Sequence, residues 1–226
     1  MTSSLLRKII GFVGVAWLSV AITVAPASAQ IPVQADDPLD NHLCFGEDHA
    51  RHIDACTELL DRQGLGPGVR SSAFAMRALG HSLLGKYADA IADYNAAIQI
   101  NPSFAVALNN RAWAYFKWGK AAQGLNDVER SLALDSMSPH SYDTRAHIMQ
   151  AAGQTVAAMA DYDRAMFLGG LRMVRLYQCG LAAAGLYKGK PDGQTSPELR
   201  SAFLQCVAQL TCDPLPPDEE CRAATS

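Results

Sequence analysis

The sequence lacks the short motifs that mark many enzymes. It contains no nucleophile elbow, no phosphate-cradling glycine loop and no HExxH pair. Paired carboxylates occur only where we expect surface, as at Glu219 and Glu220. We therefore expect a chain that is not an enzyme, has no cofactor and works by presenting a surface to a partner.

An excess of basic residues is also missing. The chain has 19 Lys and Arg residues against 22 Asp and Glu residues. Removal of residues 1–29 would take Arg7 and Lys8 away, which leaves 17 basic residues, the same 22 acidic residues and a net charge of −5. Nucleic-acid binding normally requires a basic face, so we do not expect nucleic acid as a partner.

A long apolar run occurs once, from Ile9 to Ala25, and no later stretch is long and apolar enough to span a bilayer. The run follows a short basic start and precedes Ala27-Ser28-Ala29, a small-x-small cleavage site. We expect residues 1–29 to be a signal peptide cleaved before Gln30; an uncleaved membrane anchor is the alternative. The mature chain is then expected in the bacterial periplasm or outside the cell, without a transmembrane segment.

Cysteine is absent from the long interval between Cys56 and Cys179. All six cysteines lie in the part that we expect to be exported, and an even number in an oxidising compartment predicts disulfides. Six cysteines allow 15 pairings, and the sequence alone does not choose among them. The most local set, which would staple both ends of the chain, joins Cys44 to Cys56, Cys179 to Cys206 and Cys212 to Cys221.

A local cluster of His42, Cys44, His49 and His52 raises the alternative of a metal site. Its spacing matches no standard set of metal ligands, and Cys44 is better used in a disulfide. We therefore expect no bound metal.

An internal repeat of 34 residues fills the interval that lacks cysteine. Three residue types of different chemistry keep this one period. A repeat of this length indicates a stack of similar helix pairs, not a globular enzyme core. The recurring residues are Gly85, Gly119 and Gly153, then Arg77, Arg111 and Arg145, then Asp93, Asp127 and Asp161.

Within one unit, Arg77 and Asp93 lie about equally far from the turn at Gly85, on helices expected to be antiparallel. We therefore expect each arginine to face an aspartate of its own or the adjoining unit, in a structural ion-pair ladder. Exposed pairs of this kind contribute only roughly 0.2–1 kcal/mol each, so the ladder would set register more than stability.

Apolar residues at i, i+3 and i+7 mark the second helix of each pair, as Ile91, Tyr94 and Ile98 do in the first. A glycine follows each first helix, and glycine ends helices well because it accepts a left-handed backbone. The expected pairs span residues 71–84 with 87–100, 105–118 with 121–134, and 139–152 with 155–168. Further helices are expected at 49–63 as an N-terminal cap, at 171–186 and from 196 onward.

A characteristic set of residues recurs across the three units: Gly85, Tyr87, Ala90, Tyr94, Ala97 and Pro102, then Ala112, Tyr115 and Gly119, then Ala146, Gly153, Ala158, Tyr162 and Ala165. This set resembles the tetratricopeptide repeat family. The resemblance implies an all-α, right-handed superhelical array of antiparallel helix pairs that binds peptide or protein segments in a concave groove. We expect four regions: the signal peptide at 1–29, an N-terminal segment with a capping helix at 30–70, three repeats at 71–172 and a C-terminal helical cap at 173–226.

The resemblance also implies that the first helix of each pair lines the groove. An asparagine there donates to and accepts from an extended peptide backbone, while tryptophan and phenylalanine supply stacking area. The alternative is that Trp113 and Phe116 only fill space between helices. The Lys and Arg set by which the family clamps carboxylates is not present, so a chaperone tail is not the expected partner. The expected partner-binding residues are Asn109, Trp113, Phe116, Lys117, His140, Asp143, His147 and Gln150.

The stretch from Leu181 to Phe203 has a different character. Its Gly185, Tyr187, Gly189, Asp192, Gly193, Pro197, Leu199, Ala202 and Phe203 are similar to part of the small peptidoglycan-binding domain of bacterial cell-wall enzymes. The resemblance implies a helix, a tight loop and a second helix that starts near Ser196. This stretch is therefore either a C-terminal cap or a wall-binding module.

Two functions follow from these patterns. The favoured expectation is a periplasmic scaffold that binds an extended segment of another envelope protein in its groove. The alternative is a cell-wall (peptidoglycan) binding module that acts through the C-terminal helix-loop-helix around Tyr187 and Asp192.

Overall fold

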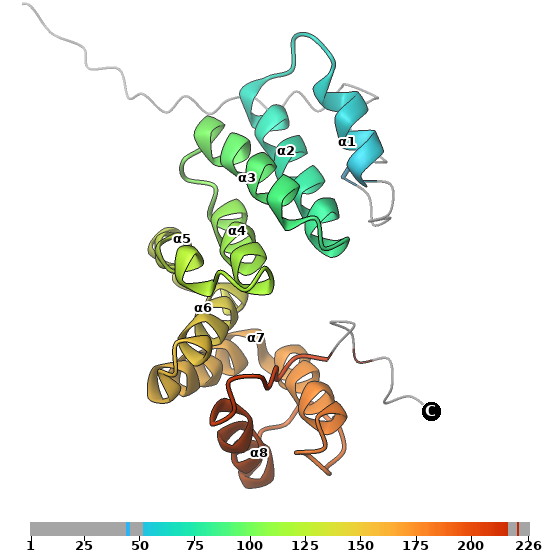
Figure 1. The fold of residues 1–226 in the computed structure, drawn as a ribbon. Helices are drawn as coiled ribbons and strands as arrows, with labels where there is room; N and C mark the ends of the chain where they lie inside the picture. Colours follow the sequence, from blue (N-terminus) through green and yellow to red (C-terminus); the bar gives the residue numbers. More distant parts are fainter. Residues whose placement is uncertain (1–43, 46–51, 217–220, 222–226) are drawn as a thin grey trace, which may run out of the picture. The chain divides into compact units, whose positions relative to one another are not determined.

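The computed structural model describes residues 44–45, 52–216 and 221, and within them the chain forms only helices, turns and loops (Figure 1). The expected signal peptide at 1–29 and the expectations for His42 and His49 lie outside the described residues. All described residues belong to one compact unit. The helices are α1 (His52–Leu60), α2 (Pro67–Leu83), α3 (Tyr87–Ile100), α4 (Ala105–Lys117), α5 (Ala121–Leu134), α6 (Pro139–Ala151), α7 (Thr155–Ala183) and α8 (Pro197–Val207).

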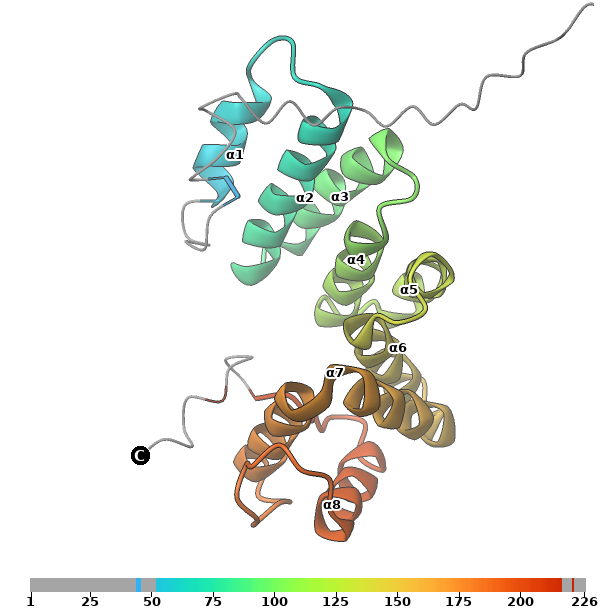
Figure 2. The ribbon, with the colours of Figure 1, turned by 180° about the vertical axis from the view of Figure 1, so that it is seen from behind.

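The helices from α2 to α7 form three consecutive pairs, which Figures 1 and 2 show from opposite sides. A turn joins the two helices of each pair at Gly85, Gly119 or Gly153, where φ is 71°, 74° and 73°. Glycine adopts this left-handed backbone without steric cost, which explains why it recurs at the turn. The all-α class is confirmed, and the predicted pairs agree closely with the helices except at the start of α2 and within α7.

The apolar stripe of each second helix lies in the core. Tyr94, Val128 and Tyr162 are fully buried at equivalent positions 34 residues apart. Close packing between paired helices requires small residues, since a side chain at Gly124 in α5 would overlap the carbonyl oxygen of Ala112 in α4. The predicted stripe therefore forms the apolar contacts that hold the repeats together.

The predicted ion-pair ladder is present in all three units. Each arginine makes two hydrogen bonds to the aspartate 16 residues later: Arg77 to Asp93 at 2.7 and 2.7 Å, Arg111 to Asp127 at 2.6 and 2.7 Å, and Arg145 to Asp161 at 2.7 and 2.8 Å. The aspartate side chains are only 5–10% exposed, so the pairs are more buried than the surface pairs that we expected. Each bidentate pair fixes the register of two helices within one unit.

The N-terminal cap is α1, which packs against α2. Cys44 and Cys56 form the predicted disulfide, and Cys56 is fully buried in a small core of its own. We expected the first helix of the array to begin at residue 71, but α2 already begins at Pro67. Proline suits the first helical position because its φ is preset and it has no amide hydrogen to leave unpaired.

Helix α7 runs through the break that we expected near residue 170. Gly170 alone has a non-helical backbone, with φ 57° and ψ −149°, and it kinks the helix into two arms. The second arm and α8 build a core with the last repeat, in which Tyr177, Leu181 and Phe203 are fully buried. At the start of α8, as predicted, Ser196 caps the helix by accepting a hydrogen bond from the Leu199 amide.

Two of the three local disulfide pairings were wrong. Cys206 pairs with Cys212, and Cys179 pairs with Cys221, so the second bridge encloses the first. The chain turns back directly after α8, which brings the Cα atoms of Cys206 and Cys212 to 5.2 Å. Pro214 and Leu215 then lie against Gly180 of α7, and Cys221 bonds to Cys179 and not to Cys212 as we had expected. The cysteines nevertheless staple both ends of the array.

Candidate functional site

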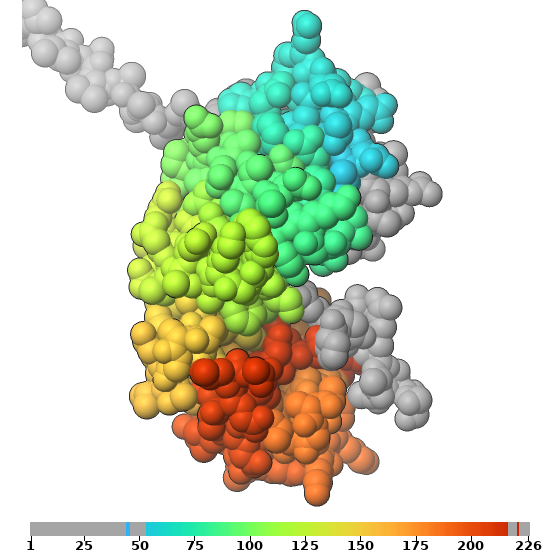
Figure 3. Space-filling model, viewed as in Figure 1, coloured from blue at the N-terminus to red at the C-terminus, as the bar shows by residue number. Residues whose placement is uncertain are grey.

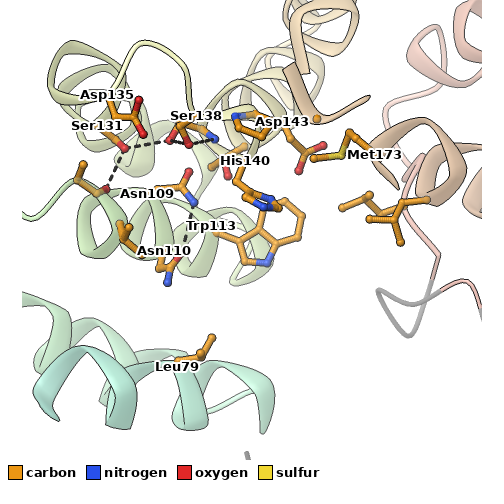
Figure 4. Close-up of a pocket in the computed structure, with 18 of the residues that line it drawn as sticks. Leu79, Asn109, Asn110, Trp113, Ser131, Asp135, Ser138, His140, Asp143 and Met173 are labelled. Atoms are coloured by element: carbon orange, nitrogen blue, oxygen red, sulfur yellow. Dashed lines mark hydrogen bonds between the residues drawn. The ribbon is translucent and has the colours of Figure 1, made fainter. Parts of the chain in front are cut away.

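A groove of about 480 Å³ runs along the first helices of the three pairs, α2, α4 and α6, and is bordered by the second arm of α7. In Figure 4, Asn109, Asn110 and Trp113 project from α4 toward the space that Leu79 borders from α2. His140 comes from α6 and lines the same space. This is the face on which the partner-binding residues are expected.

Three buried polar atoms on this face have no hydrogen-bond partner within the described residues. They are the Tyr94 hydroxyl, the Ser82 Oγ atom and the Asn109 Oδ1 atom, and all three residues line the groove. Ser82 and Asn110 lie close to the Tyr94 hydroxyl, but neither meets it with hydrogen-bonding geometry. Burial raises the pKa of Tyr94 well above its ordinary value, so the phenol stays neutral and able to donate. A folded chain rarely leaves such groups unpaired, so a ligand that pairs them would gain affinity.

An aromatic cluster adjoins these polar groups. The ring of half-buried Trp113 lies 5.1 Å from that of Phe116 and 5.1 Å, edge to face, from that of His147. The Lys117 ammonium lies 5.3 Å from the Trp113 ring centroid. Contacts of this kind hold the tryptophan in one orientation while one side of it still faces the groove.

Further along α6, the expected groove residues are covered by the chain itself. Asp143, His147 and Gln150 are only 6%, 2% and 3% exposed. The covering element is residues 208–216, which follow α8 and which we call the tail segment. Figure 3 shows this red part of the chain against the yellow-green surface that contains α4.

Charged groups attach the tail segment at Asp213. Its Oδ1 atom lies 3.1 Å from Nε2 of His147, and its Oδ2 atom lies 3.7 Å from Nζ of Lys117. Burial alone would raise the pKa of Asp213, but the hydrogen bond and charge of His147, with Lys117, hold it below its ordinary value. The carboxylate is thus ionised and bridges α4 and α6.

Gln150 holds the disulfide-closed turn at the start of the tail segment. Its Nε2 atom lies 3.4 Å from the carbonyl oxygen of Cys206, 3.1 Å from that of Gln209 and 2.7 Å from that of Cys212. The Tyr162 hydroxyl donates to Oε1 of Gln150 at 2.9 Å, which fixes the orientation of the amide. The two N–H groups of the Gln150 amide are therefore shared among three backbone oxygens.

Asp143 is the most enclosed acidic group of the site. Tyr177 donates to its Oδ1 atom at 2.5 Å, and Nδ1 of His147 lies 3.4 Å from the same atom. Burial raises the pKa of Asp143 above its ordinary value, although the charge of His147 opposes the shift. Burial would lower the pKa of His147, but Asp143 and Asp213 outweigh it and raise that pKa.

The eight expected residues therefore fall into two groups. Asn109, Trp113, Asp143 and the exposed His140 line the open groove, and Phe116 packs against Trp113. Lys117, His147 and Gln150 contact the tail segment. That any of them binds a partner stays a prediction. The sequence analysis did not include Tyr94, Ser82, Asn110 or Asp213 among the candidates.

The loop that resembles a peptidoglycan-binding domain is tied down internally. Fully buried Gln178 donates to Oδ1 of Asp192 at 3.0 Å, to the carbonyl oxygen of Gln194 at 2.9 Å and to the Tyr187 hydroxyl at 3.2 Å. The Gly193 amide donates back to Oε1 of Gln178 at 2.7 Å. Tyr187 is itself buried. These contacts serve the packing of the loop on α7.

Neither a metal-binding cluster nor a membrane-spanning helix is found in residues 52–216 and the flanking described positions. No group of three or more His, Cys, Asp or Glu residues there is arranged to hold a metal ion. No helix of that part combines the length and hydropathy needed to cross a bilayer.

The fold and the groove define a helical-repeat binding protein, and comparison with known proteins agrees. The TPR repeat profile matches residues 83–119. The chain is 33% identical over 125 residues to "Hsp70-Hsp90 organizing protein" of Triticum aestivum, which covers 55% of this chain and 17% of that protein. It is 30% identical over 131 residues to "Tetratricopeptide repeat protein 36" of Bos taurus, which covers 56% of this chain and 68% of that protein. The chain belongs to the tetratricopeptide repeat family.

Among solved structures, the chain is similar to one titled "Crystal structure of MamA", with a TM-score of 0.46 and 14% identity over 54% of this chain and 68% of that one. The chain spans only 17% of the length of the first relative named above. Its repeats indicate a scaffold for protein–protein interaction.

Proposed function

We propose that this chain is a periplasmic or secreted scaffold that holds an extended segment of another envelope protein in the groove of α2, α4 and α6. The observation that carries the proposal is the set of buried, unpartnered polar atoms on Tyr94, Ser82 and Asn109. These atoms are closed to water in the free chain. An extended segment offers an amide N–H and a carbonyl oxygen at almost every residue, so it would pair them once side chains at the groove floor turn toward it. The apolar side chains of Leu79 and Trp113 border the same space and would contact its side chains.

Two observations support the compartment and the kind of partner. The six cysteines are all paired, which suits an oxidising compartment. The name of the wheat relative refers to two other proteins, Hsp70 and Hsp90, which favours a protein over a small molecule as partner. Electrostatic attraction is not the main source of affinity, since the open groove combines exposed His140 and Arg172 with the exposed Asp135.

Site-specific photocrosslinking in cells tests the proposal. A photoreactive residue at Asn110, which lines the groove, is expected to give a discrete adduct with one envelope protein. The same residue at Glu129, which is exposed on α5 and does not line the groove, is the matched control. Equal adducts at both positions, or none at Asn110, would contradict the proposal.

Sedimentation with purified cell wall tests the alternative. The wall-binding module remains the second hypothesis, but the hydrogen bonds of Gln178 occupy Tyr187 and Asp192 within the chain. We therefore expect the protein to stay in the supernatant. Sedimentation that is lost in an Asp192→Ala variant would favour the wall ligand over the protein partner.

A further inference from the structure

The tail segment contacts the array in the way that a bound peptide would. It lies across side chains of α4 and α6 but is not part of any repeat. Gln150 binds two of its backbone oxygens, those of Gln209 and Cys212, and Lys117 and His147 bind one acidic side chain. Backbone recognition combined with one charged anchor is how a groove binds an extended segment.

The tail segment also reaches the open groove. Leu215 lines the same 480 Å³ space as Trp113 and Asn109. The covered surface and the open groove are therefore continuous, and a longer segment that lies in the groove would meet the tail segment.

Two features keep the tail segment in place. The Cys179–Cys221 disulfide ties the chain to α7 five residues beyond its end. Gly180, the next residue on α7, allows its backbone to pass directly over the helix, because a Cβ at this position would overlap the carbonyl oxygen of Pro214 and the backbone of Leu215. A glycine within a helix often marks such a close approach of another backbone.

We propose that Lys117, His147 and Gln150 form a second peptide subsite, which takes a partner segment carrying an acidic residue, and that the tail segment is its internal competitor. The proposal rests on the proposed function, since it extends the same groove. The ligand chemistry follows from the contacts. Lys117 and His147 select a carboxylate, and the Gln150 amide selects backbone carbonyl oxygens that point to one side.

The competition has a measurable consequence. While the tail segment occupies the subsite, only the fraction of molecules in which it has left binds an external segment, so the apparent affinity falls by that fraction. Variants that displace the tail segment should raise this affinity without any change in Lys117, His147 or Gln150.

Two full-length variants displace it by different means. Gly180→Ala places a methyl group against the Pro214 carbonyl, and the Cys179→Ser, Cys221→Ser double variant removes the disulfide that ties the chain beyond the tail segment. Ala183→Ser, at an exposed position on the same helix, is the matched control. The probe is a fluorescent synthetic peptide, Ser-Asp-Pro-Leu-Pro-Pro, which copies residues 212–217 with Ser in place of Cys212.

Fluorescence anisotropy is measured together with hydrogen exchange of residues 209–216 and circular dichroism. We expect both variants to exchange faster in this segment, to keep their helicity and to bind the peptide at least about tenfold more tightly than the wild type and the control. A peptide with Asn in place of its Asp should lose most of this gain.

Three outcomes would overturn the proposal. The first is faster exchange without tighter peptide binding. The second is no change in exchange in either variant. The third is loss of helicity in both variants, since the tail segment would then be a structural part of the cap. Failure here leaves the crosslink at Asn110 intact, because that experiment uses the wild-type tail, so the two proposals fail separately.

Discussion

The Nε2 atom of His147 lies 3.1 Å from the Oδ1 atom of Asp213, a residue that follows 66 positions later in the chain. On the opposite side of the ring, Nδ1 lies 2.8 Å from the backbone oxygen of Asp143 and 3.4 Å from its carboxylate. The buried imidazole thus lies between two acidic side chains, one from its own helix and one from the tail segment. Attachment of the tail segment therefore depends on the protonation of His147.

The directions of the pKa shifts of His147 and Asp213 set the pH range in which their contact stabilises the fold. The pKa of His147 is raised above 6.5, so its contribution to stability is complete below pH 6.5 and is lost as pH rises through the raised value. The pKa of Asp213 is lowered below 3.8, so its contribution is present above pH 3.8 and is lost as pH falls through the lowered value. The contact should be strongest between these two limits.

We therefore predict that a His147→Gln variant removes a pH dependence. Other titratable groups surround the ring. Asp143 lies beside it and accepts from Tyr177, Lys117 lies beside Asp213, and the Tyr162 ring packs edge-on against the imidazole. Both tyrosines stay neutral because burial raises their pKa values. Urea unfolding at pH 5.5 and 8.5 measures the effect. The stability advantage of the wild type over the variant should be larger at pH 5.5, and an advantage that is equal at both pH values would contradict the prediction.

The repeats were predictable because their contacts are local. The turn at Gly85, the stripe around Tyr94 and the pair of Arg77 and Asp93 all lie within one 34-residue unit, so periodicity alone revealed them. The covering of Gln150 and His147 was not predictable, because their partners lie 56 to 66 residues away and no period connects them.

One local signal for the tail segment was available in the sequence. Gly180 lies inside the helix expected at 171–186, and a glycine there leaves room for another backbone to approach closely. The disulfides were mispredicted for a related reason. We expected Cys206 to reach Cys179 on the neighbouring helix, which left Cys212 for Cys221, whereas the passage of the tail segment over Gly180 leaves Cys179 paired with Cys221.

Disulfide mapping checks this arrangement directly. Non-reducing peptide mapping of the oxidised protein should recover Cys44–Cys56, Cys179–Cys221 and Cys206–Cys212. A Cys44→Ser, Cys56→Ser variant should lose roughly 2–4 kcal/mol of stability, because the unfolded chain is no longer constrained by the disulfide. Recovery of a peptide that joins Cys212 to Cys221 would contradict the described path of the tail segment.

The arginine and aspartate of each ion pair in the ladder should be energetically coupled, so the pairs should contribute to stability as well as fix the helix register. A double-mutant cycle on Arg111 and Asp127, whose side chains are 16% and 5% exposed, is expected to give a coupling of roughly 0.5–3 kcal/mol. The pair of Arg200 and Asp163, which is 59% and 43% exposed, serves as the control and should give less than about 1 kcal/mol. Equal couplings in the two cycles would show that burial does not strengthen the ladder.

The C-terminal cap should be essential for the stability of the array. Phe203 of α8 is fully buried against Tyr162 and Tyr177 of α7, so Phe203→Ala should cost about 3–5 kcal/mol and lower the melting temperature. Leu204→Ala, next to it but 53% exposed, should change stability by less than about 0.5 kcal/mol. Deletion of residues 171–226 should also lower the melting temperature sharply, because it exposes the last repeat. A truncated protein that melts like the full chain would rule out the capping role.

Trp113 is the residue on which the open groove is best tested. It is half-buried, contacts Phe116 and His147 on one side and lines the groove with the other. Trp113→Ala should reduce partner affinity by more than about 1 kcal/mol, since a few large aromatic anchors carry most of the energy in such interfaces. The change in affinity is measured from the yield of the Asn110 photocrosslink at increasing protein concentrations.

Trp118→Ala is the matched control for this variant. Trp118 is 39% exposed, stacks with Lys120 and does not line the groove, so its loss should leave the crosslink unchanged. Circular dichroism separates binding from folding. If Trp113→Ala loses helicity, the ring serves to fill space between helices, which is the alternative that the sequence left open. If the variant keeps both its helicity and its crosslink yield, the partner is held elsewhere, and the loop from Tyr187 to Gly193 becomes the next surface to test.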